Sequence, residues 1–169
     1  RARTVKDANL LARYSKLAID ELDELELDGY ESEIELEHVG QLKGTLKYGQ
    51  LDIKEVKQEA SLTAYELDGA IGRAGYLHFS DSKYGEYTLG TIDKLVLDQS
   101  YEDDMTIREV ATLKGKTQYA EWVINRLSSR LELEGYESDI EIEKITEQTE
   151  QIVIDGKYNE LKMEEHTSE

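Results

Sequence analysis

The chain has 169 residues, a formal net charge of −18, no cysteine and no proline. The missing cysteine excludes a disulfide framework, thiolate zinc sites and cysteine nucleophiles. The acidic balance argues against direct binding to nucleic acid or to an anionic membrane, because both surfaces are negatively charged. No apolar run reaches the roughly 18 residues that a membrane span needs, and residues 1–11 lack the apolar stretch of a signal peptide.

The first element in chain order is predicted to be an amphipathic helix upstream of Leu25. Asp7 is the expected N-cap of this helix, with Asn9 as the alternative. Four apolar residues are spaced so that they would share one helical face. They are Tyr14, Leu17, Ile19 and Leu22.

Residues 25–37 alternate apolar and acidic side chains and are predicted to form a β-hairpin, with Asp28 and Gly29 in a two-residue type I′ turn. In this register Leu27 faces Tyr30, and every glutamate lies on the opposite face. The alternative is one long strand with a glycine bulge, which would keep the same apolar face together.

The middle of the chain is predicted to supply the strands of a central antiparallel sheet. An acidic turn follows at 98–104, where carboxylates could coordinate calcium or magnesium. Its spacing matches no defined cation loop, so a solvated turn is the favoured interpretation. The segments that alternate like strands are 51–56, 60–67, 76–79, 87–97 and 106–113.

Residues 131–143 repeat residues 25–37, with ten of thirteen positions identical. The similarity extends upstream, where Trp122 aligns with Leu17 and is therefore expected in the core. The sequence thus predicts an α+β fold, in which internally duplicated helix plus antiparallel β-hairpin units pack with a central antiparallel sheet. We expect a single compact domain over 1–169, with repeat unit A at 5–54, central strands at 55–113 and repeat unit B at 114–164.

No pattern indicates a catalytic residue, a cofactor-binding residue or a metal ligand. With 38 aspartates and glutamates in the chain, a pair of carboxylates is no signal of acid–base chemistry. The glycines at 69, 72 and 75 do not match a phosphate-binding loop. We therefore expect no cofactor and no enzymatic role. The three histidines lack metal-ligand spacing and are interpreted as structural; they are His38, His78 and His166.

The acidic side of the two hairpins is the candidate interaction face. In the hairpin register Glu26 lies across from Glu31, and like charges directly opposite each other are destabilising. Water and salt, lysines of a neighbouring strand such as Lys43, or a bound cation or basic partner could offset this repulsion. The candidate residues are Glu26, Glu31, Glu33, Glu35, Glu132, Glu137, Asp139 and Glu141.

Two segments resemble phage tail hub and tail-associated proteins. Residues 60–67, ASLTAYEL, are similar to the strand-to-helix T-A-Y-D corner of that family. Residues 113–127, followed by Gly135, are similar to its G-K-T helix opening. The resemblance implies a sheet-rich ring with a helix packed alongside. Duplicated units in three chains would imitate a sixfold ring, and an electronegative lumen would let DNA slide without binding.

Two functions of different classes follow. The first is a structural or assembly protein, a phage tail tube or hub-like ring component with an acidic face. Such a protein would form a homo-oligomer or bind other assembly proteins, in the cytoplasm or the virion. The alternative is an acidic binding module for a basic protein partner or a cation.

Overall fold

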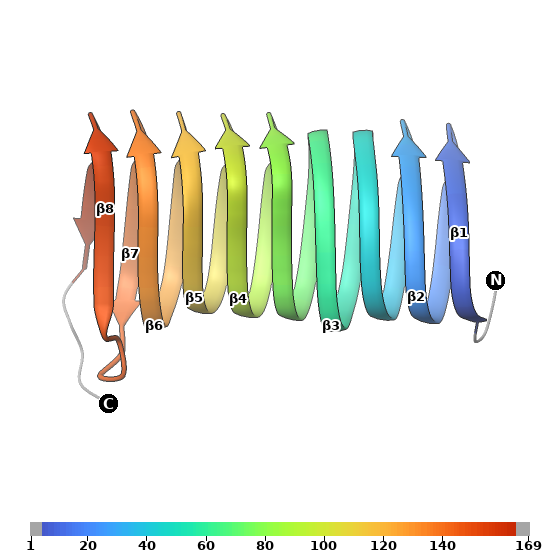
Figure 1. The fold of residues 1–169 in the computed structure, drawn as a ribbon, viewed down its shortest axis with the longest axis horizontal. Helices are drawn as coiled ribbons and strands as arrows, with labels where there is room; N and C mark the ends of the chain where they lie inside the picture. Colours follow the sequence, from blue (N-terminus) through green and yellow to red (C-terminus); the bar gives the residue numbers. More distant parts are fainter. Residues whose placement is uncertain (1–4, 165–169) are drawn as a thin grey trace.

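The computed structural model describes residues 5–164, which wind into one parallel β-solenoid with two layers (Figure 1). Within this range there is no helix, and so none long and apolar enough to cross a membrane. Most of the labelled strands pass from one layer to the other without a break, and β3 runs unbroken through several coils. The strands are β1 (Val5–Arg13), β2 (Lys16–Tyr30), β3 (Glu33–Lys83), β4 (Glu86–Tyr101), β5 (Asp104–Gln118), β6 (Glu121–Tyr136), β7 (Asp139–Ile145), β8 (Gln151–Lys157) and β9 (Glu160–Met163).

Every strand pairs in parallel with the strand of the next coil. The order along the sheet is β1-β2-β3-β4-β5-β6-β7-β9, while β8 pairs with β6. A residue meets its equivalent 17 or 18 positions later, as Leu17 meets Ile34 and Leu89 meets Ile107. The backbone N–H and C=O groups of each coil are therefore satisfied by the neighbouring coils, as in any parallel ladder.

The core lies between the two layers and consists of stacked aliphatic side chains. In the front layer of Figure 1 the segments lead up to one edge of the solenoid, such as 23–30 and 76–83. In the back layer the segments leave that edge, such as 33–39 and 68–74. Burying one leucine contributes about 1.5–3 kcal/mol, so a stack that repeats in every coil stabilises both layers. One fully buried stack is Leu77, Leu95, Leu113 and Leu131.

The α+β prediction is wrong, because both predicted helices are strands of the solenoid. The first lies in β1 and β2, and the second lies in β5 and β6. Inward-facing residues are two positions apart within a strand and three positions apart where the chain turns between layers. Their average spacing imitates a helical period. This series in β2 is Leu17, Ile19, Leu22, Leu25 and Leu27.

The predicted antiparallel hairpins and antiparallel sheet are also wrong. Gly29 lies inside β2 without a positive φ, and the chain turns after Tyr30, where Glu31 has φ 46°. The partner of Glu26 is Lys43 in the next coil, not Glu31. The expected repulsion between glutamates across a hairpin is therefore absent here.

The two similar segments do not mark duplicated helix–hairpin units, because the unit that repeats is one coil of the solenoid. Tyr30 and Tyr136 occupy equivalent places, each between two other tyrosine rings. Ile34 and Ile140 are both buried. The intervening residues form the same kind of coil, because β3, β4 and β5 follow one another in continuous parallel register. The match between distant segments is thus a match between two coils of one array.

Candidate functional site

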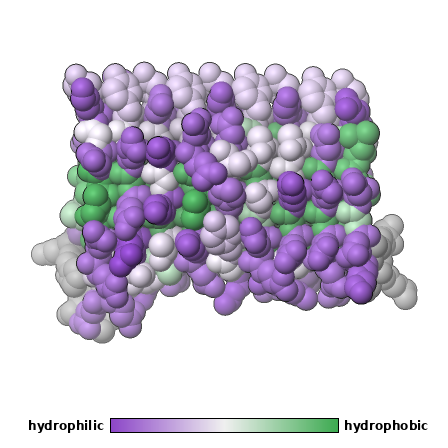
Figure 2. Space-filling model, viewed as in Figure 1, coloured by the Kyte–Doolittle hydropathy of each residue, from purple (hydrophilic) through white to green (hydrophobic). Residues whose placement is uncertain are grey.

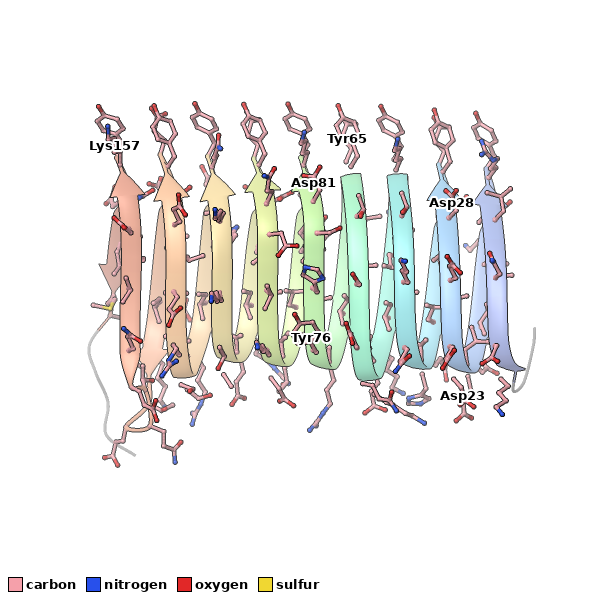
Figure 3. All side chains as sticks on the ribbon, viewed as in Figure 1. Asp23, Asp28, Tyr65, Tyr76, Asp81 and Lys157 are labelled. Atoms are coloured by element: carbon pink, nitrogen blue, oxygen red, sulfur yellow. The ribbon has the colours of Figure 1, made fainter. Side chains whose placement is uncertain are left out.

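One edge of the solenoid carries an uninterrupted ladder of tyrosine rings, which project beyond the ends of the front strands (Figure 3). Neighbouring ring centroids are 5.4 to 5.9 Å apart, and the ring planes meet at 81° to 89°. Edge-to-face geometry is favourable because the positive ring edge meets the negative ring face. The members of this tyrosine ladder are Tyr14, Tyr30, Tyr48, Tyr65, Tyr84, Tyr101, Tyr119, Tyr136 and Tyr158.

The perpendicular rings arise from an alternation in the backbone. At the corner one position is left-handed, and it is held in turn by tyrosine and glutamate: Tyr48 has φ 55° and Glu66 has φ 47°. In coils where glutamate takes this position, the tyrosine is the preceding residue, as Tyr65 precedes Glu66. The ring therefore leaves the backbone from two different sites in alternate coils. We infer that this alternation sets each ring nearly perpendicular to the next.

Charge follows the same alternation along this edge. Where the left-handed residue is tyrosine, the preceding residue is Arg13, Lys47, Lys83, Gln118 or Lys157. Where it is glutamate, the carboxylate lies beside the phenols. The pKa of Tyr136 is raised by the Glu137 carboxylate and by partial burial. Burial first, and then the neighbouring ring and carboxylate, raise the pKa of Tyr48. The phenols of Tyr48 and Tyr136 therefore ionise less readily than that of a free tyrosine.

Replacing an interior ring is expected to cost more than replacing a terminal one. Tyr84 makes edge-to-face contacts with Tyr65 and Tyr101, whereas Tyr14 contacts only Tyr30 among the described residues. Each such pair contributes about 0.5–1.5 kcal/mol. Tyr84→Leu should therefore lower the free energy of unfolding by about 1–3 kcal/mol and Tyr14→Leu by about half of that. Urea denaturation of both variants measures the difference, and equal losses would contradict pairwise stacking.

The predicted acidic turn at 98–104 is one of these corners, and it holds a buried carboxylate. Asp103 is fully buried and accepts hydrogen bonds from Ser82 Oγ at 3.0 Å, from Gly85 N at 2.8 Å and from Ser100 Oγ. Burial raises the pKa of Asp103, while these hydrogen bonds act in the opposite direction. No group of three or more His, Asp or Glu residues suited to a metal ion occurs in residues 5–164. Asp103 is thus a structural acceptor that joins two coils.

A second continuous row of one residue type lies on the back face. Six carboxylates occupy the first outward position after the tyrosine edge, one in each successive coil, and all are exposed. No ion pair to any of them is found within residues 5–164. They line a shallow groove of about 680 Å³. This carboxylate row is Asp68, Glu86, Asp104, Glu121, Asp139 and Glu160.

The eight residues predicted as one acidic face are divided among three surfaces. Glu26 and Glu132 lie in front-layer segments, where each pairs in register with a lysine, Lys43 or Lys114. Glu31 and Glu137 are left-handed residues of the tyrosine edge. On the back face, Glu33 and Glu35 lie near the N-terminal end, and Asp139 and Glu141 lie near the C-terminal end. Only Asp139 belongs to the carboxylate row.

Sequence reasoning missed the other five members of the row, although a signal was present. An acidic residue follows each of the last six ladder tyrosines by two or three positions, as Glu86 follows Tyr84 and Asp104 follows Tyr101. The tyrosines themselves recur mostly at intervals of 17 or 18 residues. Reading that interval as one coil would have aligned the acids on a single face.

The fold defines a class, the parallel β-solenoids, in which stacked coils present repetitive surfaces. No known protein family, no curated protein and no solved structure matches the chain.

Proposed function

We propose that this chain is a structural β-solenoid that binds a basic protein partner through the carboxylate row. β-Solenoids commonly serve structural roles, which agrees with an assembly function. The observation that carries the proposal is the alignment of six exposed carboxylates, one per coil, on one face. The resemblance to phage tail proteins remains a prediction. The helix–hairpin unit from which a ring was inferred does not occur in residues 5–164.

The row is a favourable surface for positive charge because its members repel one another. Parallel strands are about 4.8 Å apart, and two unit charges at that distance in water repel by about 0.9 kcal/mol. A cationic partner replaces this repulsion with attraction, and the interaction weakens as salt screens it. In the first coils the equivalent positions hold Lys16, Glu33 and Gln50, and Lys16 pairs with Glu33 at 3.4 Å. The attraction is thus confined to the coils from Asp68 onward.

Binding of a lysine-rich peptide to the full chain tests this proposal. The triple variant Asp104→Asn, Glu121→Gln and Asp139→Asn is expected to weaken binding about tenfold or more, since each exposed pair contributes up to roughly 1 kcal/mol. Titration calorimetry at low and physiological salt measures the affinity. The loss should be smaller at high salt because screening already removes part of the attraction.

A matched control removes the same number of charges from the tyrosine edge. The variant Glu31→Gln, Glu66→Gln and Glu102→Gln changes three exposed carboxylates, the left-handed residues of three coils. It is expected to change the affinity less than about threefold. Equal weakening by both triple variants would show that only net charge matters and would refute a back-face site.

A further inference from the structure

Three polar side chains form a hydrogen-bonded chain across successive coils of the front layer. Ser61 Oγ lies 3.2 Å from His78 Nδ1, and His78 Nε2 lies 2.8 Å from Asp98 Oδ2. A hydroxyl, an imidazole and a carboxylate in this order are the groups that make a serine nucleophilic. We propose that Ser61, His78 and Asp98 form an acyl-transfer site that accepts the acyl group of small activated esters. This site is on the opposite layer from the carboxylate row and does not depend on it.

The hydrogen bonds assign a role to each nitrogen of the imidazole. A carboxylate can only accept, so Nε2 of His78 carries the proton that is donated to Asp98. In the neutral ring Nδ1 is then the acceptor, and it faces the Ser61 hydroxyl. His78 is therefore positioned as the general base, and Asp98 is a positioning residue that fixes the tautomer.

The fold brings the three residues together although they are far apart in sequence. Ser61 and His78 are 17 residues apart, so they are neighbours in adjacent coils. Asp98 follows His78 by 20 residues, more than one coil. His78 is in register with Val96 of the next coil. Asp98 lies two positions after Val96 and so on the same face of the sheet, from where its carboxylate reaches the imidazole diagonally.

A groove on the front face ends at the nucleophile. Ser61 and Lys43 both line this groove, which has a volume of about 580 Å³. Gly44 abuts Leu62 of the next coil, so Lys43 and Ser61 lie side by side. Lys43 has no ion pair or hydrogen bond with any residue in the described part of the chain. Its ammonium group is therefore available to stabilise an oxyanion next to Ser61.

The rest of the groove selects the kind of ester. Its other charged lining residues are all acidic: Asp7, Glu24, Glu26 and Glu59. Figure 2 shows that polar residues cover much of this face. A cationic ester is attracted by these carboxylates, whereas an anionic ester is repelled. The substrate class is thus a small ester that carries a positive charge away from its carbonyl group.

The reaction balances with the ester and water alone. The Ser61 oxygen bonds to the carbonyl carbon while its proton moves to His78 Nδ1, and the carbonyl electron pair moves onto oxygen. Collapse of this intermediate breaks the bond to the leaving alcohol, which takes the proton from His78. Water then attacks the acyl-serine with His78 again as base, which releases the acid and restores Ser61. General base catalysis of this kind contributes about 10²- to 10⁴-fold.

Reaction of the full chain with p-nitrophenyl acetate tests the proposal. Acetylation is expected on Ser61 and is located by peptide mass spectrometry. The ester should release p-nitrophenolate about 10²-fold faster in reaction with Ser61 than in reaction with an ordinary surface serine. Ser61→Ala should abolish the acetylated peptide, and His78→Gln should slow acylation by about the same 10². Asp98→Asn should slow it, and Asp98→Glu should restore much of the rate. Rescue by the longer carboxylate distinguishes positioning from a general loss of structure.

Two residues outside the proposed site serve as matched controls. Ser80 is another front-layer serine, but its hydroxyl bonds Thr63 and not a histidine. His38 also pairs with a carboxylate, Glu55, at 3.2 Å. Ser80→Ala and His38→Gln should leave the rate unchanged. Unchanged acylation in Ser61→Ala, or equal losses in His38→Gln and His78→Gln, would overturn the assignment.

The charge preference gives a second readout. The test compares two p-nitrophenyl esters, a cationic one with a trimethylammonium acyl group and an anionic one with a succinyl acyl group. Each rate is divided by the rate at which the same ester hydrolyses without protein. The cationic ester is expected to react at least about tenfold faster than the anionic one. A preference for the anionic ester would refute the role assigned to the groove.

Discussion

Replacing Trp122 with alanine is expected to lower the free energy of unfolding by about 3–5 kcal/mol. The indole is the largest fully buried side chain and lies between Met105 and Ile140 of the adjacent coils. Its Nε1 donates a hydrogen bond to the Asp103 carbonyl at 3.2 Å. Alanine would leave both a cavity and a carbonyl oxygen without its indole donor. The hydrogen bonds between coils fix the spacing of the strands, so the surrounding structure cannot close the cavity.

Urea denaturation followed by circular dichroism measures this effect. Trp122→Phe is the control, since it keeps most of the apolar volume and should lose about half as much stability. Hydrogen exchange adds a spatial test. In a solenoid each coil contacts only its neighbours, so loss of protection should concentrate in β5, β6 and β7. A uniform loss along the chain would show that the coils unfold as one unit.

Replacing Asp103 with alanine is expected to lower the free energy of unfolding by about 3 kcal/mol. Two serine hydroxyls and the Gly85 N–H would lose their acceptor, and an unpaired buried donor costs about 1–3 kcal/mol. The control is Asp103→Ser, because Ser32 and Ser138 occupy the same corner position in other coils and are buried there. The Asp103→Ser variant should therefore lose less stability than the Asp103→Ala variant. Thermal and urea denaturation provide both values.

The pH dependence of Asp103 has a definite sign. Because burial raises the pKa of its carboxyl group, the folded chain holds this proton more tightly than the unfolded chain. The stabilisation from protonation is complete below the ordinary carboxyl pKa of about 4 and is lost as the pH rises through the raised value. The advantage of wild type over Asp103→Ser in unfolding free energy should therefore shrink as the pH rises above about 4. An advantage that grows with pH would contradict a raised pKa of Asp103.

The alternation of residues could be read correctly without the structure. Leu25, Leu27, Ile34 and Leu36 were predicted to share a buried side, and they are buried. Trp122 was predicted in the core by its alignment with Leu17. These predictions succeeded because the division between apolar and acidic positions is a local property of each strand. The choice between a hairpin and a coil is not local, since Gly29 would suit a tight turn as well as a strand interior.

By itself, the sequence determined which side chains face inward, that the unit repeats and that the surface is acidic. Only the tertiary structure decided which residues of different coils are neighbours. Parallel coils place residues 17 or 18 positions apart in contact, so Glu26 meets Lys43, and Asp68 meets Glu86. The same winding aligns Ser61 with His78 and builds the tyrosine ladder. Period-two alternation is compatible with either strand direction, and interactions between coils, which no single segment contains, fix the parallel one.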